Sequence, residues 1–142
     1  MPEQFMQIPD DMIFRAVFLN PHKKESKVSI GIGVDMDFTA RIDMSGDVTI
    51  ADNVYISQGV MIYTHDHKMK RGQSVHEGEL KIGGIVIGKN AWIGARAMIL
   101  EQCHKIGEGA IIGAGAVITH DVGDYEIIAG NPGMKVGEVQ PT

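Results

Sequence analysis

Isoleucine recurs every six residues through the second half of the chain. Between residues 85 and 120 the period slips by only one residue, and it comprises Ile87, Ile93, Ile99, Ile106, Ile112 and Ile118. Six is a multiple of neither the 3.6 residues of a helical turn nor a heptad, so a helix would scatter these side chains over all its faces. The spacing therefore excludes an amphipathic helix over this segment.

Small residues keep the same period. Glycine accounts for 18 of 142 residues and proline for five, against a usual glycine share of roughly 7%. An alanine stands four positions after most of these isoleucines: Ala91, Ala97, Ala110 and Ala116. We expect Asn53, Gly59 and Asn90 to form corners, because glycine and asparagine tolerate a positive φ.

The period extends upstream to residue 28 and predicts a solenoid of short parallel strands. Three six-residue units would close a triangular coil of about 18 residues, and coils would stack roughly 4.8 Å apart. Residues 28–62 and 85–122 would form about four coils. Short antiparallel strands are the alternative, but no Asn-Gly or Asp-Gly hairpin signal separates these segments. The fold class is therefore all-β.

Residues 63–84, with the sequence YTHDHKMKRGQSVHEGELKIGG, interrupt the period. A solenoid accommodates such an insertion by extruding it as a loop, and long loops on rigid scaffolds commonly carry function. This segment is therefore the first place to look for a site.

Charge and composition exclude several classes of protein. Thirteen Lys and Arg against 18 Asp and Glu give a net charge of -5, which argues against nucleic acid as a partner. The single cysteine, Cys103, excludes an internal disulfide and suits a reducing compartment. No apolar run is long enough for a membrane span, and the N-terminal MPEQFMQIPDD does not resemble a signal peptide. We expect a cytoplasmic protein.

Residues 28–136 resemble the hexapeptide-repeat acyltransferases, in particular the maltose, galactoside and colanic acid O-acetyltransferase group. The matching stretches are VTIADNVYISQGVMIYTHDH (48–67), IVIGKNAWIGARAMIL (85–100), IGEGAIIGAGAVITHDV (106–122) and IIAGNPGMKV (127–136). The resemblance implies a single-stranded left-handed parallel β-helix over 28–136, after a short segment 1–27 and before a tail 137–142. It also implies acetyl-CoA as co-substrate, a sugar acceptor, no required metal, and a homotrimer with active sites between subunits.

Two histidines of the insertion are the candidate catalytic residues. Acyl transfer from a thioester to a hydroxyl needs a base, and histidine suits that role near neutral pH. In an extended strand His65 and His67 share one face and Asp66 points away, so Asp66 is poorly placed to orient either ring. The resemblance places the general base seven residues after Val60, at His67, and leaves His65 as second candidate or acceptor contact. The alternative is that either histidine is merely solvated.

The remaining histidines give weaker signals. His76 lies in the insertion without a counterpart in the family and is expected on the surface, and His22, His104 and His120 fall outside the insertion.

The donor site rests on the resemblance alone. It places Trp92 beside the cofactor, although packing on the outside of a coil is an equal alternative. It lines the pantetheine groove with Ala95, Ala114 and Gly115, where a backbone N–H could stabilise the oxyanion.

The resemblance assigns the cofactor's phosphates to the C-terminal part of the chain. Thr119-His120 matches a Thr-Lys pair that reaches a phosphate, and His120 in place of the lysine weakens or moves that contact. Lys135 would lie near the nucleotide end.

On the acceptor side the resemblance places Asp37 where a related asparagine contacts the sugar, with a plain corner residue as the alternative. Asp10-Asp11 could cap at most a short helix before the repeats. The long N-terminal segment of the maltose and galactoside enzymes has no counterpart here, so their acceptor is not carried over.

The sequence thus predicts an acetyl-CoA-dependent transferase acting on a sugar hydroxyl, or less favourably an amine, by direct transfer without an acyl-enzyme. Cys103 lies away from the histidine insertion and is discounted as a nucleophile. One alternative is a non-catalytic solenoid used in assembly. The other is a γ-carbonic-anhydrase-like metal enzyme, which needs three histidines around zinc. The ligand pattern of that family, a distant histidine followed by a close pair downstream, is absent, since His104 and His120 are sixteen residues apart.

A trimer would also cover apolar side chains on the outside of the coils. We expect four residues to lie there: Val54, Tyr55, Val86 and Trp92.

Overall fold

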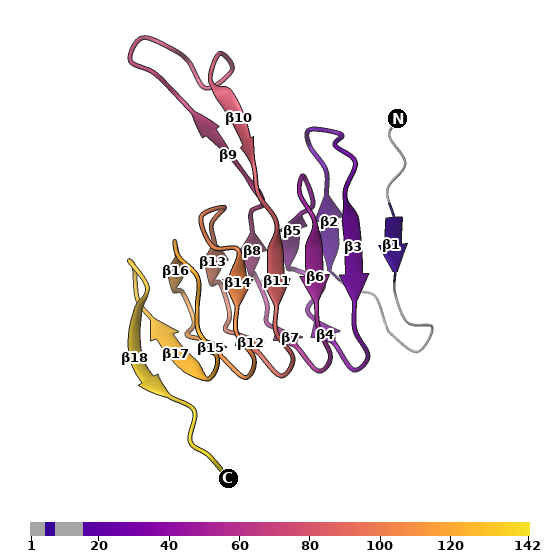
Figure 1. Cartoon of the computed structure of the whole chain (residues 1–142), viewed down its shortest axis with the longest axis vertical. Coiled ribbons are helices and arrows are strands. Elements are labelled where there is room, and N and C mark those ends of the chain that lie inside the picture. Colours follow the sequence, from indigo (N-terminus) through magenta and orange to yellow (C-terminus); the bar gives the residue numbers. More distant parts are fainter. Residues whose placement is uncertain (1–4, 8–15) are drawn as a thin grey trace.

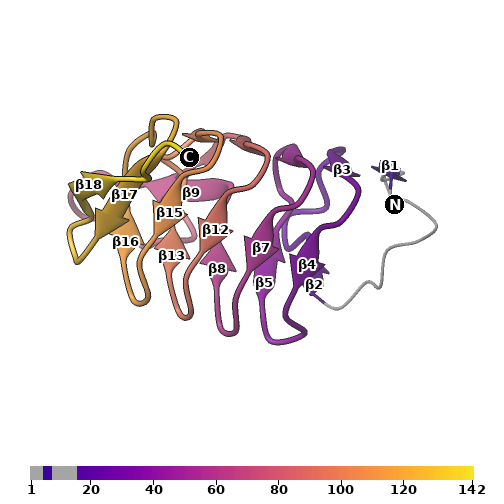
Figure 2. The same cartoon turned by 90° about the horizontal axis from the view of Figure 1, so that it is seen from below.

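Three parallel sheets run along a triangular solenoid (Figures 1 and 2). The structure, a computed structural model, describes residues 16–142 and the backbone of strand β1, so the expected cap at Asp10-Asp11 lies outside the described residues. Sheet A contains β1 (Phe5–Gln7), β3 (Lys27–Ile30), β6 (Val48–Ile50), β11 (Ile85–Ile87) and β14 (Lys105–Ile106). Sheet B contains β2 (Val17–Leu19), β5 (Arg41–Asp43), β8 (Met61–Ile62), β13 (Met98–Ile99) and β16 (Val117–Ile118).

Sheet C forms the third side and continues into an antiparallel edge. It contains β4 (Asp35–Met36), β7 (Tyr55–Ile56), β12 (Trp92–Ile93), β15 (Ile111–Ile112), β17 (Glu126–Ala129) and β18 (Met134–Glu138). Only the β17–β18 pair in this sheet is antiparallel. The described part of the chain contains no helix, and accordingly none that could cross a bilayer. The predicted all-β parallel solenoid is confirmed.

Four complete coils form the body of the solenoid, as the six-residue period predicts. They are β3–β4–β5, β6–β7–β8, β11–β12–β13 and β14–β15–β16, with a partial coil at each end. Strand β2 pairs in parallel with β5, and β18 reaches Glu138. Sheet structure therefore extends beyond the expected limits of 28 and 136 at both ends.

The core is a stack of isoleucines with alanines between them. Ile56, Ile93 and Ile112 stand in register on sheet C and are all fully buried. Burying one such side chain stabilises the fold by about 1.5–3 kcal/mol. Ala91, Ala97, Ala110 and Ala116 are buried beside them. Val54 is also part of this core, so its expected place on the outside is wrong: it precedes Tyr55, and neighbouring residues of a strand face opposite ways.

The corners take the predicted residues. Asn53, Gly59 and Asn90 have φ values of 59°, 69° and 64°, the left-handed region where asparagine and glycine are least strained. The chain can therefore change sheets within a few residues.

The insertion leaves the solenoid after β8 and returns at β11 (Figure 1). It is extruded as predicted, but it is more ordered than a loop, because β9 (His65–Lys68) and β10 (Glu79–Ile82) pair as an antiparallel hairpin. The Gly83 N–H donates to the Thr64 carbonyl at 2.8 Å and closes the base of the hairpin. This hairpin fixes the direction of the two candidate histidines.

Candidate active site

His65 and His67 lie side by side on strand β9. Their ring centroids are 5.5 Å apart and the ring planes are nearly perpendicular, at 89°. Asp66, between them, accepts the His67 backbone N–H at 2.8 Å and the Gln102 side-chain amide at 3.4 Å. The Asp66 carboxylate therefore orients neither ring, in line with the expectation from strand alternation.

The carboxylate that orients His65 belongs to Asp43, at the end of β5. The Nδ1 atom of His65 lies 2.6 Å from Asp43 Oδ2. Asp43 is buried, and a carboxylate accepts hydrogen bonds and does not donate them, so Nδ1 of His65 carries the proton. In the neutral ring, the lone pair is therefore on Nε2.

Asp43 is held as an anion by its own hydrogen bonds. Burial would raise its pKa, but the hydrogen bonds from Ser45, His65 and Thr64 outweigh burial and lower it. The Ser45 hydroxyl donates to Oδ1 at 2.6 Å, and the Thr64 N–H donates to Oδ2 at 2.8 Å. A buried anion with these donors is a fixed anchor for the imidazole of His65.

A third histidine, His22, lies against the pair. It belongs to the turn between β2 and β3, and its ring centroid is 4.5 Å from that of His65 and 5.6 Å from that of His67. Burial lowers the pKa of His22, and the neighbouring His65 and His67 lower it further. The Nε2 atom of His22 is buried with no hydrogen-bond partner in the described part of the chain. The lowered pKa favours the neutral form of His22, whose ring packs edge-on against the other two.

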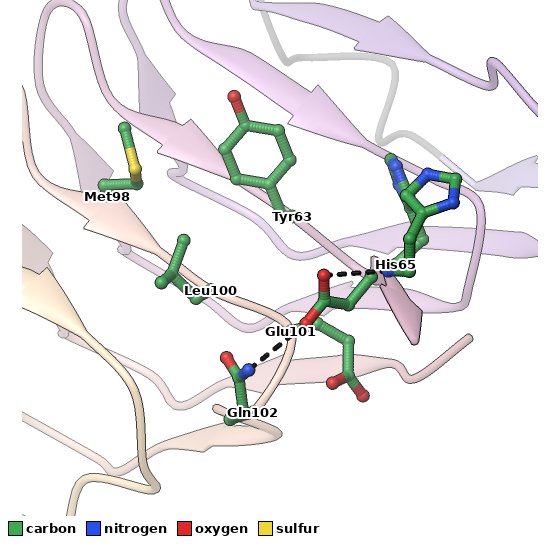
Figure 3. A pocket seen from close by; sticks show the side chains of 8 residues that line it. Tyr63, His65, Met98, Leu100, Glu101 and Gln102 are labelled. Carbon is green, nitrogen blue, oxygen red and sulfur yellow. Dashed lines mark hydrogen bonds between the residues drawn. The ribbon is translucent and has the colours of Figure 1, made fainter. Parts of the chain in front are cut away.

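A cleft of about 340 Å³ opens beside these histidines (Figure 3). One wall comes from the hairpin side, with Tyr63, His65, Asp66 and His67, and the other from the next coil, with Met98, Leu100, Glu101 and Gln102. Glu101 is buried and pairs with Lys81 of β10, whose Nζ lies 3.1 Å from Oε2. This ion pair links the hairpin to the coil that supplies Glu101. An imidazole base beside a partly apolar cleft can deprotonate a bound hydroxyl.

Other predicted residues gather in a different corner of the solenoid. Asp37, Ala95 and Gly115 lie in the corners between sheets C and B of successive coils, where the strands of sheet B begin. The hairpin leaves from the opposite end of those strands. Within one subunit the structure therefore separates Asp37, Ala95 and the Ala114–Gly115 turn from the histidines.

Two of these corner residues already have backbone or side-chain partners. The Gly115 N–H donates to the Ala95 carbonyl at 2.9 Å, so the expected oxyanion donor at Gly115 is already used within the solenoid. Asp37 accepts the Thr39 N–H at 2.9 Å and closes a turn.

Trp92 lies on sheet C, away from the hairpin. Its Nε1–H donates to the Ser57 hydroxyl at 3.1 Å, and 49% of the residue is exposed. It borders a cleft of about 830 Å³ formed with the C-terminal residues 138–142. Trp92 therefore lies on the outside of its coil, which is one of the two positions considered from the sequence. It also borders a cavity, as a residue beside a cofactor would.

The residues expected to contact the cofactor's phosphates lie in two separate parts of the structure, after β16 and on β18. Thr119 and His120 are exposed and follow β16, at the same end of sheet B as the hairpin. The Nζ atom of Lys135 lies 2.6 Å from Glu138 and 3.7 Å from Glu126. The hydrogen bond to Glu138 raises the pKa of Lys135. Two carboxylates therefore already balance the charge of this lysine.

Asp43 and His22 are site residues that the sequence did not predict. Asp43 directly follows a core isoleucine, and the two-residue insertion Ser45-Gly46 behind it breaks the period, which is a usable signal. His22 gives no such signal, because it lies before the repeats begin.

Comparisons with known proteins agree with the fold. Residues 84–120 match the family model described as bacterial transferase hexapeptide (six repeats). A Staphylococcus aureus (strain COL) protein, named provisionally as an acetyltransferase, is 36% identical over 126 residues, covering 79% of this chain and 62% of that protein. Galactoside O-acetyltransferase of Escherichia coli (strain K12) is 31% identical over 114 residues, covering 80% of this chain and 55% of the relative.

The chain therefore spans less than two thirds of the length of these two relatives. Among solved structures, a galactoside acetyltransferase in complex with coenzyme A superposes with a TM-score of 0.78 at 25% identity, covering 96% of this chain and 64% of that chain.

Proposed function

We propose that this chain, which matches the hexapeptide-repeat transferase model over residues 84–120, transfers the acetyl group of acetyl-CoA to a hydroxyl, in preference to an amine, of a sugar or sugar-containing precursor. The observation that carries the proposal is the pair of histidines on an ordered hairpin at the edge of a cleft. Relatives named as acetyltransferases, and a solved galactoside acetyltransferase with coenzyme A bound, support the donor and the class of acceptor.

The reaction needs one proton to move in each direction. The acceptor oxygen attacks the thioester carbonyl while the imidazole of His67 takes the hydroxyl proton. The tetrahedral intermediate then breaks its C–S bond, and the imidazolium returns the proton to the departing thiolate. In the described part of the chain no side chain hydrogen-bonds the His67 ring, so a ring nitrogen is available for this work. His65, held by Asp43, fixes the position of the neighbouring ring and can contact the acceptor.

The proposed donor site requires a second subunit. Most of the predicted donor and acceptor residues lie on other sides of the subunit than His67: Asp37, Trp92, Ala95, Ala114, Gly115 and Lys135. Only Thr119 and His120 lie at the end of sheet B from which the His67 hairpin leaves. A cyclic homotrimer would bring one subunit's sheet C or its corners to the hairpin of the next, and closed cyclic assembly is a common arrangement. Tyr55, Val86 and Trp92 are about half exposed and would be covered by it.

A transfer assay tests the proposal. The purified chain would be incubated with acetyl-CoA and a panel of sugar acceptors, and release of free coenzyme A thiol would be followed. Loss of one general base typically costs about 10²- to 10⁴-fold in rate, so His67→Ala should fall by about a hundredfold or more, with coenzyme A affinity nearly unchanged. His65→Ala should lose less, and His76→Ala, an exposed histidine of the same hairpin, should match the wild type.

Two outcomes would change the assignment. A dead His65→Ala with an active His67→Ala would move the base to His65 with Asp43 behind it. No coenzyme A binding at millimolar concentration, by calorimetry, would favour a non-catalytic assembly module instead.

A further inference from the structure

Three histidines, two of which line the cleft, form a cluster that could hold a metal ion. One ring nitrogen from each of His22, His65 and His67 lies within 4.8 Å of the other two. The ligands come from two separate segments, the turn after β2 and strand β9. Neutral imidazole is the commonest protein ligand for zinc and related transition metals. The proposed proton transfer from the acceptor uses only His67 and does not account for His22.

The hydrogen bonds around the cluster leave the ligand nitrogens open. Asp43 accepts the Nδ1 proton of His65, so in the neutral ring the lone pair is on Nε2, away from Asp43. A carboxylate behind a ligating histidine is the usual arrangement at metal sites, where it fixes the tautomer and the orientation of the ring. The Nε2 atom of His22 is buried without a hydrogen-bond partner in the described part of the chain, which a metal ion would supply.

We propose that His22, His65 and His67 form a site for a divalent transition metal of the zinc class, with Asp43 as the orienting carboxylate and the fourth position open to water. Zinc–nitrogen bonds of about 2.0–2.1 Å in a tetrahedron place the nitrogens roughly 3.3 Å apart. The rings must therefore approach one another from the present limit of 4.8 Å. Rotation of His22 in its turn and of His67 about its side-chain bonds supplies this movement, while His65 stays on Asp43.

The metal and the acceptor would compete for the same histidine. A ring nitrogen that binds a metal has no lone pair for a proton, so an occupied site stops the transfer. This consequence rests on the proposed function, with His67 as the base. The metal would then be an inhibitor that the reaction does not require.

Direct metal binding tests the site without relying on activity. Untagged protein, freed of metal with a chelator, would be titrated with Co²⁺ and followed by the visible absorption of tetrahedral cobalt, and with Zn²⁺ by calorimetry. We expect one ion per chain and a rise in melting temperature with zinc, because a ligand that binds the folded state stabilises it. His22→Ala and His22→Gln should each weaken binding by about tenfold or more, and Asp43→Asn by about 10- to 100-fold. His76→Ala should bind as the wild type does.

Melting temperatures measured in chelator identify any variant that fails to fold, and His22→Gln keeps a polar side chain of similar size as a second probe. The site is rejected if the wild type binds neither ion at tens of micromolar, or if both His22 variants bind as tightly as the wild type. Zinc that binds at the cluster but leaves an active enzyme unaffected would instead reject the competition with His67. A protein without transferase activity that still binds one zinc through His22 would separate the metal site from the proposed function.

Discussion

The Nδ1 atom of His65 lies 2.6 Å from Oδ2 of Asp43. The two residues belong to successive coils and are 22 positions apart in the sequence. Asp43 ends a strand of sheet B, and His65 begins the hairpin that leaves the next coil. One buried carboxylate therefore connects the regular solenoid to the insertion that interrupts it. The position of the histidine cleft depends on this contact.

Asp43→Asn should weaken both the fold and the site. An amide of the same size retains one acceptor oxygen, so it cannot accept the bonds of Ser45, Thr64 and His65 together. A buried donor left without a partner costs about 1–3 kcal/mol, which chemical unfolding would measure. Asp35→Asn is the control, because Asp35 is an exposed carboxylate of β4, and its unfolding midpoint should match the wild type. Equal midpoints for the two variants would show that the Asp43 network stabilises nothing.

Lys81→Met should loosen the hairpin. Glu101 is 1% exposed at its side chain, and its Oε2 lies 3.1 Å from the Lys81 Nζ. Without the lysine the buried carboxylate keeps only the His104 ring, whose Nε2 lies 3.9 Å from Oε1. The partial exposure of Lys81 reduces the usual penalty to about 1–3 kcal/mol. Lys89→Met is the control, because it breaks the ion pair between Lys89 and Glu108, in which both side chains are more exposed than in the Lys81–Glu101 pair. The loss of this pair should cost below about 1 kcal/mol. Amide exchange of Leu80 and Ile82 should rise in Lys81→Met alone, and unchanged exchange there would contradict the anchoring role.

Gly46→Ala should destabilise the base of the hairpin. A Cβ on Gly46 would lie 1.6 Å from the carbonyl oxygen of Gly83, so the backbone must move. Forcing extra volume into a packed site typically costs about 1–3 kcal/mol, and occasionally more. Gly137→Ala is the matched control, since the nearest atom to its Cβ, on Ile127, is 3.8 Å away. Thermal melting should separate the two variants, and equal melting temperatures would mean that the hairpin base yields without cost.

The repeat made the solenoid predictable and left the site only partly so. Ile87 and Ile93 are six residues apart, as are Ala91 and Ala97, and this local rule determines which side chains enter the core. Val54 was misassigned because the period alone does not say which of two adjacent apolar residues points inward. The alternation along β7, with Tyr55 outside, decides it.

The site required contacts that no local rule contains. His65 and His67 could be found because they interrupt the repeat. Asp43 meets His65 only because the coils stack in register. His22 approaches them from a turn that precedes the repeats. Each of these contacts joins residues at least 22 positions apart, and a single sequence gives no measure of such a pairing.

Cys103 should be almost inert in the folded protein. It is 1% exposed, and burial raises the pKa of its thiol from 9.0 to about 12. Only the thiolate attacks a disulfide reagent, so this higher pKa lowers the reactive fraction by about a thousandfold at neutral pH. An aromatic disulfide reagent should therefore label the native chain about a thousandfold more slowly than the chain unfolded in guanidinium. The native rate should still climb about tenfold per pH unit up to pH 9, because the thiol remains far below its pKa. Rapid labelling of the native protein would show that the thiolate is accessible, and it would reopen an acyl-cysteine intermediate as a route for the acetyl group.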